Sequence, residues 1–289
     1  MNPSLLEYRK KAQQKAVPWH RRLSLALDRL VYKDEEEFLE NARIPLETRF
    51  SLVEGLNRLN GVSGYHYLFL RELERLAAPF LSEKGASCEP LKILDVGAGG
   101  GGLLKAIWRW ATRKKIPVKL TGIDLSEYFV QRTQSELTAQ GIDVSLHQAD
   151  ACFLDSFEEN SFDFVVSSYM VHHLRDVEKV ALFLSEVHRV ARQGWLVVDL
   201  ERRFWAPIFV KLAGIVFQAP SVLISDGVKS ARRAYRASEI NWILEGAQKT
   251  KNLSGMTCAP FPFFPYWLIK GRKNSPSSLE EIRLVRSGD

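Results

Sequence analysis

Cysteine is scarce in this sequence, and its few cysteines form no recognisable site. The 289 residues include three of them, Cys88, Cys152 and Cys258, which lie far apart and form no C-x-x-C pair. Zinc sites and disulfide-built domains need cysteines in closely spaced sets. We therefore expect reduced thiols in a cytoplasmic protein, with Cys152 buried after a strand and no metal site.

A strong excess of charge of one sign is also absent. The 40 basic and 34 acidic residues leave a formal net charge of +6, and the basic residues form small clusters such as Arg113–Lys115 and Arg232–Arg233. A nucleic-acid partner would need a continuous basic face, so we expect solvated surface at these clusters and no nucleic-acid partner. Residues 1–22 hold no apolar run of signal-peptide length and predict a basic amphipathic helix.

The chain changes character near residue 84. Apolar residues recur three and four positions apart in residues 50–59 and 67–81, which predicts an N-terminal helical region over residues 1–83, interrupted at Gly61 and Gly64. Short apolar runs then alternate with helical patterns over residues 84–273, which we interpret as one domain. Residues 274–289 predict a loosely held C-terminal tail.

Five strands are predicted in the first part of that domain, at residues 91–96, 118–125, 143–150, 162–169 and 195–200. The helices predicted between them cover residues 103–112, 126–139 and 177–191, the last ended by Gly194. This alternation predicts a doubly wound α/β fold with a mostly parallel sheet. Beyond it we expect a helix over residues 238–245, closed by Gly246, and two strands near residues 251–257 and 266–270.

The run ILDVGAGGGGLLKAI, from Ile93 to Ile107, fits two kinds of cofactor loop. Gly97 to Gly102 spells G-x-G-x-x-G, which is typical of dinucleotide sites, and Asp95 to Gly101 spells D-x-G-x-G-x-G, which is typical of S-adenosylmethionine sites. A carboxylate at Asp95 repels a pyrophosphate but can bond the ammonium group of S-adenosylmethionine. The charge therefore favours S-adenosylmethionine, and the glycines let the backbone approach it closely.

Acidic residues also end the second and third predicted strands. Asp124 can accept hydrogen bonds from both ribose hydroxyls, although dinucleotide folds place an acid similarly. Asp150 can accept a bond from the adenine amino group, and the Ala151 amide can face the ring. Ligands of open α/β sheets bind beyond the carboxyl ends of the strands, so these acids fit one cofactor site.

The segments ILDVGAGGG, GIDLS, ADA and FDFVVSSYMVHHL resemble, in this order, the motifs of class I S-adenosylmethionine-dependent methyltransferases. The resemblance covers about residues 91–200, and HHL and RRAYRASEINWILEGA are similar to the branch with ubiquinone and menaquinone biosynthesis enzymes. The segment LNRLNGVSGYHYLFLREL is weakly similar to methyltransferases found beside polyketide synthases. The resemblance implies a Rossmann-like fold, S-adenosylmethionine as cofactor with S-adenosylhomocysteine as product, and a small-molecule acceptor of secondary metabolism. The cofactor-binding residues that it implies are Asp95, Gly97, Ala98, Gly99, Gly101, Asp124, Leu125, Asp150, Ala151 and Ser167.

Two histidines follow the fourth strand on the cofactor side. A hydroxyl or acidic-carbon acceptor is helped by a general base, and imidazole titrates near neutral pH. We take His173, and after it His172, as candidates for this base; the alternative is that they cap the next helix or pack against the cofactor. Tyr169 is expected to point into the acceptor pocket. The remaining histidines are expected to be structural or exposed: His20, His66, His147 and His188.

Residues 204–224, FWAPIFVKLAGIVFQAPSVLI, are almost all apolar. The run is long enough to span a membrane, but Lys211, Gln218 and two prolines argue against a span. Three interpretations stay open: a cap insertion (residues 201–236) over the acceptor pocket, a core segment packed on the N-terminal helices, or a weak membrane-surface contact. In the first, Phe204 and Trp205 contact the acceptor. The aromatic residues 259–267 either line that pocket or pack at the surface.

An apolar cap predicts a hydrophobic acceptor such as a phenol, a polyketide or a quinone precursor. Oxygen is the expected acceptor atom and carbon is the alternative. Residues 167–170 read SSYM and lack the Pro-Pro pair of many base-modifying methyltransferases. A protein that binds S-adenosylmethionine or a lipid without catalysis is the alternative from another class. A monomer and a homodimer both stay open.

Overall fold

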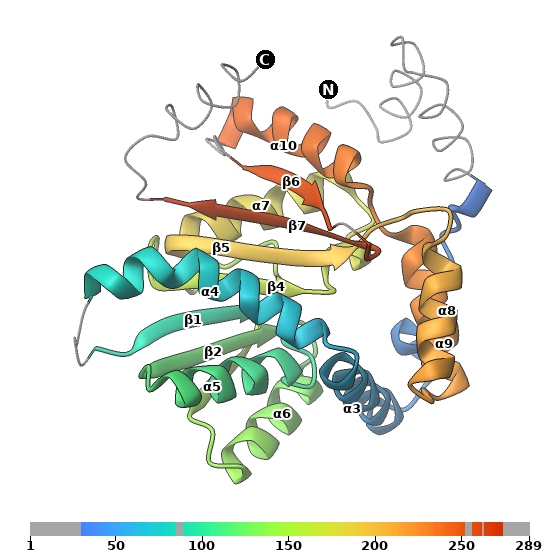
Figure 1. The fold of residues 1–289 in the computed structure, drawn as a ribbon, viewed down its shortest axis with the longest axis horizontal. Helices are drawn as coiled ribbons and strands as arrows, with labels where there is room; N and C mark the ends of the chain where they lie inside the picture. The colour runs from blue at the N-terminus through green and yellow to red at the C-terminus, as the bar shows by residue number, and fades with distance from the viewer. Residues whose placement is uncertain (1–29, 85–88, 252–255, 262, 274–289) are drawn as a thin grey trace.

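The fold is built on one twisted sheet (Figure 1). The computed structural model describes residues 30–84, 89–251, 256–261 and 263–273. The seven strands lie in the order β3-β2-β1-β4-β5-β7-β6. Their bounds are Leu91–Val96 (β1), Val118–Asp124 (β2), Val144–Gln148 (β3), Phe162–Ser168 (β4), Ala191–Leu200 (β5), Thr257–Pro260 (β6) and Tyr266–Arg272 (β7). β1 to β5 pair in parallel and β7 pairs antiparallel with β5 and β6, which confirms the doubly wound, mostly parallel α/β fold.

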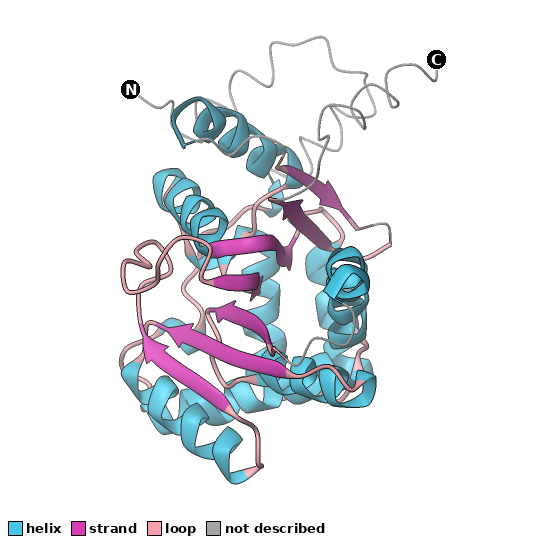
Figure 2. Ribbon diagram, turned by 90° about the vertical axis from the view of Figure 1, so that its left-hand side faces the viewer, coloured by secondary structure: helices cyan, strands magenta, loops and turns pink. Residues whose placement is uncertain are grey.

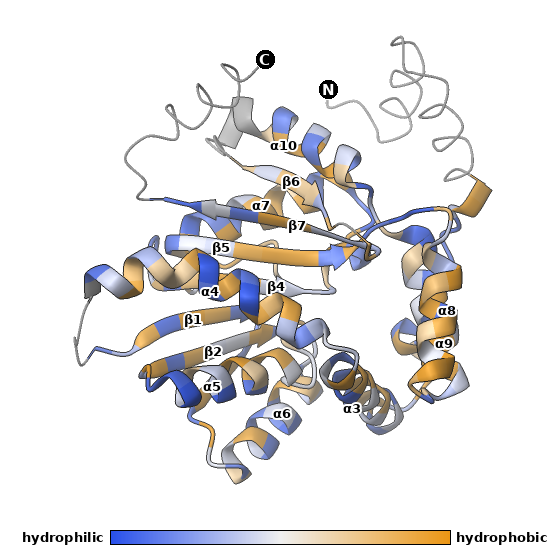
Figure 3. Ribbon diagram, in the orientation of Figure 1, coloured by the Kyte–Doolittle hydropathy of each residue, from blue (hydrophilic) through white to orange (hydrophobic). Residues whose placement is uncertain are grey.

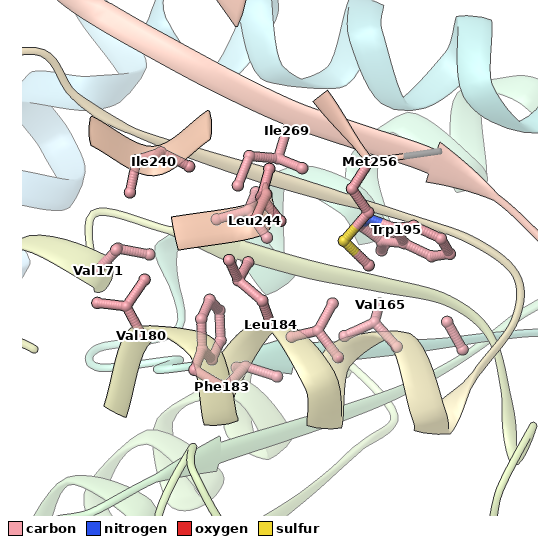
Figure 4. Packing of buried hydrophobic residues seen from close by; sticks show 14 of the residues in the cluster. Val165, Val171, Val180, Phe183, Leu184, Trp195, Ile240, Leu244, Met256 and Ile269 are labelled. Carbon is pink, nitrogen blue, oxygen red and sulfur yellow. The ribbon is translucent and has the colours of Figure 1, made fainter. Parts of the chain in front are cut away.

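Helices cover both faces of the sheet, as Figure 2 shows. One face packs against α4 (Tyr65–Lys84), α5 (Gly102–Lys114) and α6 (Glu127–Ala139), and the other against α7 (Val177–Val190) and α10 (Ala237–Lys251). Figure 4 shows the second core, where Phe183 and Leu184 of α7 meet Leu244 of α10 across Trp195 and Ile269. The strands are therefore buried on both sides, which explains their continuous apolar runs.

Side-chain caps begin two of these helices, and one of the two caps was predicted. The Ser126 side chain accepts a hydrogen bond from the Phe129 amide at the start of α6, as predicted. The Asp176 side chain accepts one from the Glu178 amide at the start of α7. Cys152 is buried after β3, as predicted, and Cys258 is buried in β6. These N-terminal capping residues thus fix where each helix begins.

The predicted interruption at Gly61 and Gly64 is confirmed, since α3 (Leu46–Val62) ends just after Gly61 and α4 begins just after Gly64. Two other glycines do not end helices as predicted. Gly246 lies inside α10, where a Cβ would meet no atom within 4 Å. Gly194 lies inside β5, and a Cβ on it would be 2.5 Å from the Gly271 carbonyl oxygen of β7. Its role is close strand pairing. Because α10 extends to Lys251, the strand predicted at residues 251–257 begins only at Thr257.

The remaining helices gather beyond the carboxyl ends of the parallel strands. These are η1 (Phe38–Glu40), α3, η2 (Val171–His173), α8 (Ala206–Val216) and α9 (Ser221–Arg233). Figure 1 shows α3 and the α8–α9 pair at this end of the sheet. Within the described ranges, no helix is long and apolar enough to cross a membrane. We call α8 and α9 the cap from here on.

The predicted division of the chain at residue 84 stays a prediction. In the structure, α4 shares a core with the sheet, since Phe69, Leu73 and Leu76 are buried together with strand residues. The helix predicted over residues 1–22 and the tail predicted over residues 274–289 lie outside the described residues.

Candidate functional site

The glycine loop after β1 adopts a backbone that glycine alone accepts easily. Gly97, Gly99 and Gly101 have φ values of +81°, +50° and +70°. A Cβ on Gly97 would lie 2.8 Å from Cγ of Met170, so even a methyl group would collide there. The loop is thereby held close to the residues that follow β4, and the Gly97 and Ala98 amides donate to the Ile123 carbonyl at 3.0 Å and 2.8 Å.

Two carboxyl groups lie beside this loop. Asp124, at the end of β2, accepts hydrogen bonds from the Gly99 amide at 2.9 Å and from the Ser126 amide at 2.9 Å. Asp95, at the end of β1, is almost fully buried. Burial first, and the charge of Asp124 second, raise the pKa of Asp95 to about 8. A buried, neutral Asp95 beside an acid of raised pKa is a site that a cation would stabilise and a phosphate would not.

A cavity of about 570 Å³ joins this loop to the cap. That volume lies within the range of roughly 300–1,000 Å³ that is usual for small-molecule sites. The cap lines it with apolar residues of α8 and α9, and α3 and α4 close it from the N-terminal side. Its side chains from α3 and α4 include Val53, Leu56, Asn57, Asn60, Tyr65 and His66. The N-terminal helices therefore form part of the site.

The structure brings only some of the predicted site residues to the cavity. Those that line it are Asp95, Gly97, Ala98, Gly99, Asp124, Tyr169, His172 and His173. Those outside its lining are Gly101, Leu125, Asp150, Ala151, Ser167, Phe204 and Trp205.

Several of the predicted residues outside the cavity lining make contacts that support the fold. The Ser167 hydroxyl donates to the Val96 carbonyl at 2.8 Å in the core, and Gly101 precedes α5 with no room for a Cβ. Leu125 and Asp150 are exposed beyond β2 and β3, and Asp150 accepts a hydrogen bond from the Cys152 amide. Their roles toward the cofactor stay predictions.

Three tyrosines from distant parts of the chain meet in the cavity wall. Tyr169 has a φ of +54°, unusual for a bulky residue, and its ring stacks on Tyr65 with centroids 4.3 Å apart. Tyr266 lies edge-on to both rings. The Tyr65 hydroxyl is 2.8 Å from the Ser168 hydroxyl, and burial raises the pKa of all three phenols. The three hydroxyls therefore stay protonated at neutral pH.

His172 forms a buried pair with a carboxylate that the sequence did not single out. Its Nδ1 is 2.7 Å from Oδ1 of Asp199 in β5, and both residues are buried. Burial works to lower the pKa of His172, but the Asp199 carboxylate outweighs it and raises that pKa. Asp199 stays ionised, with a lowered pKa, so Nδ1 of His172 donates and the carboxylate accepts. His172 is thereby fixed in one ring orientation.

His173 forms a second, more open pair. Its Nδ1 is 2.7 Å from Oε1 of Glu40 in η1, and Arg233 binds both oxygens of the same carboxylate at 2.6 Å and 2.7 Å. Burial works to raise the pKa of Glu40, but the bonds from His173 and Arg233 hold it well below its usual range. The ionised Glu40 accepts from Nδ1–H, which leaves Nε2 of His173 as a proton acceptor.

Arg233 and Asp226 of α9 bind η1 to the cap. Asp226 accepts hydrogen bonds from the Phe38 and Leu39 amides at 2.8 Å and 3.0 Å, and Arg233 lies 2.7 Å from Glu37. We expected solvated surface at Arg232–Arg233, and for Arg233 this was wrong, because the residue is buried between two glutamates. The acidic run before residue 40 was its only sequence signal.

One histidine that the sequence did not assign to the site lies at the cavity. His66 was predicted to be structural or exposed, yet it lines the cavity, where burial lowers its pKa to about 4. His188 lies within α7 beside Trp195, as a structural residue should. The sequence did not indicate this position because α4 was predicted to belong to a separate helical region and not to the site.

One group of the described residues has the spacing of metal ligands: Glu37, His172 and His173, whose ligand atoms lie within 4.8 Å of one another. The guanidinium of Arg233 already lies against Glu37 and 2.9 Å from Nδ1 of His173. It supplies the positive charge that a cation would bring and would repel one. These residues therefore do not fit a metal ion well.

Comparison with known proteins points to one domain type. Residues 94–198 match a family model described as a methyltransferase domain. The chain is 33% identical over 114 residues to ajmaline N-methyltransferase of Rauvolfia serpentina, covering 39% of this chain and 36% of the relative. It is 34% identical over 131 residues to demethylmenaquinone methyltransferase of Staphylococcus aureus, covering 44% and 50%. The chain thus spans half or less of the length of these curated relatives.

A solved structure shares the fold over most of the chain. It is that of the plantazolicin methyltransferase BamL in complex with a triazolic desmethylPZN analog and SAH. The TM-score is 0.55 at 15% sequence identity, and the likeness covers 80% of this chain and 92% of that one. At this identity the likeness establishes the fold alone.

Proposed function

Residues 94–198 belong to the methyltransferase domain family, and on this premise we propose that the chain transfers a methyl group from S-adenosylmethionine to an apolar small molecule. The observation that carries the proposal is the continuous cavity between the acid-flanked glycine loop and the apolar cap. S-adenosylmethionine, when bound, supplies an activated methyl group on a sulfonium, so the chain's task is to hold the acceptor in line with it.

The loop and its two acids are suited to hold that cofactor. The backbone at Gly97 and Gly99 can approach it without a Cβ, and each oxygen of Asp124 keeps a second lone pair for a ribose hydroxyl. Asp95 is placed to pair with the ammonium group. The ammonium charge would offset the free-energy cost of ionising the buried Asp95 carboxyl.

The cap and the tyrosines favour an apolar, ring-containing acceptor. Phe209, Val210, Ala213, Phe217 and Leu223 face the cavity from the cap. Apolar walls with a few polar groups are typical of such sites, and the protonated phenols can donate to an acceptor oxygen. This supports the phenol, polyketide or quinone-like class that the sequence predicted.

We propose His173 as general base for an oxygen acceptor, with Glu40 as the residue that positions it. Desolvation and the neighbouring His172 lower the pKa of His173, so Nε2 is unprotonated at neutral pH. His172, with a raised pKa, is the less suited of the two. Methylation at carbon remains the alternative, and so does binding without catalysis; the relatives' names do not decide between them.

Substitution of His173 and of its partner Glu40 tests this role. His173→Ala should lower kcat by about 100-fold, the lower range of general-base effects, with binding of S-adenosylhomocysteine unchanged. Glu40→Gln should lower kcat less and shift the pH profile, because it alters the tautomer and pKa of His173. His147→Ala, at an exposed histidine in β3, is the matched control. A loss of only a few-fold in His173→Ala would contradict the base role.

The function itself is tested by label transfer. The full chain is incubated with methyl-labelled S-adenosylmethionine and a panel of apolar phenols, quinols and polyketides, with RNA and bulk protein as parallel acceptors. We expect label in a small apolar product, whose acceptor atom mass analysis would identify. Label in RNA or protein alone would contradict the proposal, and binding of S-adenosylhomocysteine without any labelled product would favour the binding-only alternative.

A further inference from the structure

Helix α8 has two apolar faces that point to different surroundings. Phe209, Val210, Ala213 and Gly214 line the cavity. The other face consists of Ile208, Leu212, Ile215 and Val216, none of which lines the cavity. We call these four residues the outer face of α8. Their spacing of three and four places them on one side of the helix.

The outer face is open to solvent. Its side chains are 56% to 72% exposed, and Phe204, just before the helix, is 47% exposed. Figure 3 shows α8 as a hydrophobic helix at the edge of the molecule. Scattered exposed apolar residues are normal, but a contiguous stripe of them marks an interaction surface. Packing within the described part of the chain therefore leaves this face without a partner.

The apolar segment that holds the outer face carries one charged residue, and it is basic. In residues 204–224 the only charged residue is Lys211, which is exposed, and there is no Asp or Glu. Lys211 follows Ile208 by three residues and precedes Ile215 by four, so it flanks the outer face. The aliphatic stem of Lys211 can lie along the apolar stripe while its ammonium group reaches past it, which suits a helix that lies against anionic lipid headgroups.

We propose that the outer face of α8 binds the surface of an anionic lipid bilayer. The helix lies along the interface and does not span it, in agreement with the absence of a spanning helix among the described residues. A symmetric dimer built on the same face would bring two copies of Lys211 toward each other, which disfavours a second copy as the occupant. The bilayer, in contrast, offers both apolar chains and negative charge.

This surface also bears on the acceptor, and in that respect it rests on the proposed function. The two faces of α8 place the bilayer on one side of a single helix and the cavity on the other. An apolar acceptor dissolved in the bilayer would reach the cavity by passing the cap. We therefore infer that the acceptor class is lipid-soluble and is taken from the membrane.

Vesicle sedimentation with the full chain tests the proposal. The probes are vesicles of phosphatidylcholine alone and of phosphatidylcholine mixed with phosphatidylglycerol. Val216→Glu places a carboxylate at the last residue of α8, and Val62→Glu is the matched control, since Val62 is the last residue of α3, is 67% exposed and lies outside the cavity lining. We expect binding to the anionic vesicles, lowered about tenfold by Val216→Glu and unchanged by Val62→Glu.

The opposite results overturn the proposal. Absence of binding by the unmodified chain, equal binding by Val216→Glu, or loss in both variants would each show that the outer face is not a lipid surface. If the chain does not bind vesicles but forms a dimer, and Val216→Glu dissociates that dimer, the occupant of the outer face is a second copy of the chain. S-adenosylhomocysteine binding is measured in parallel. A chain that binds vesicles but not S-adenosylhomocysteine would contradict the proposed function alone. A chain that binds S-adenosylhomocysteine but not vesicles would contradict the lipid surface alone.

Discussion

At the scale of single residues, Asp95 shows how a binding site can oppose stability. Its pKa of about 8, against an ordinary 3.8, means that the folded protein holds the proton more tightly than the unfolded chain. The stabilisation from this proton is complete below the ordinary pKa and is lost as the pH rises to about 8. A buried carboxyl beside Asp124 is therefore unfavourable when ionised, and the ammonium group of the proposed cofactor would offset that cost.

Asp95 should make cofactor affinity pH-dependent. Pairing needs an ionised Asp95 and a protonated ammonium group, so the affinity for S-adenosylmethionine should rise with pH toward about 8 and fall above it, where the amino group loses its proton. Calorimetric titration between about pH 6 and about pH 9 measures this. Asp95→Asn should remove most of the affinity while raising the melting temperature of the free protein at alkaline pH. An unchanged affinity in Asp95→Asn would refute its pairing role.

At the scale of elements, the site depends on how η1, the cap and the end of β4 are joined. Arg233 contacts Glu37 and Glu40 of one segment and His173 of another, while Asp226 caps the first turn of η1. Buried ion pairs of this kind contribute little net stability when complete, but removing one partner leaves a buried charge. Arg233 therefore sets the position of Glu40 more than it adds to stability.

Arg233→Gln should accordingly destabilise the protein by about 3 kcal/mol, since it leaves Glu37 buried and unpaired. Arg232→Gln is the matched neighbour: its guanidinium pairs with Glu35 at 3.6 Å near the surface, and its loss should cost about 0–1 kcal/mol. Denaturant unfolding measures both. Adding Glu37→Gln to Arg233→Gln should restore part of the loss. Equal effects of the two arginine substitutions would contradict the buried role of Arg233.

At the scale of the whole molecule, local patterns predicted the sheet and missed the closure of the site. The five parallel strands were identified because each is a short apolar run with turn residues at its end, and Ser126 signalled the start of α6. The Asp199–His172 and Glu40–His173 pairs join residues 27 and 133 positions apart, which no local periodicity encodes. Glycine was misread at Gly194 because close strand approach and helix termination use the same residue.

The same limit explains why the N-terminal helices were treated as separate. Their period of 3.6 residues predicted that α3 and α4 form, but it does not say what they pack against. In the structure, Asn57 and Tyr65 line the cavity together with residues from the opposite end of the chain, such as Tyr266. The acceptor side of the site is therefore assembled from residues far apart in sequence, whereas most of the cofactor side comes from one short loop.

The central claim is that this loop and its acids hold S-adenosylmethionine and not a dinucleotide. Equilibrium dialysis of the full chain against S-adenosylhomocysteine and NAD tests it most directly. The account predicts saturable binding of S-adenosylhomocysteine and none of NAD at equal concentration, because the carboxyl groups of Asp95 and Asp124 beside the glycine loop favour an ammonium group over a pyrophosphate. Binding of NAD without S-adenosylhomocysteine would contradict the account at its foundation.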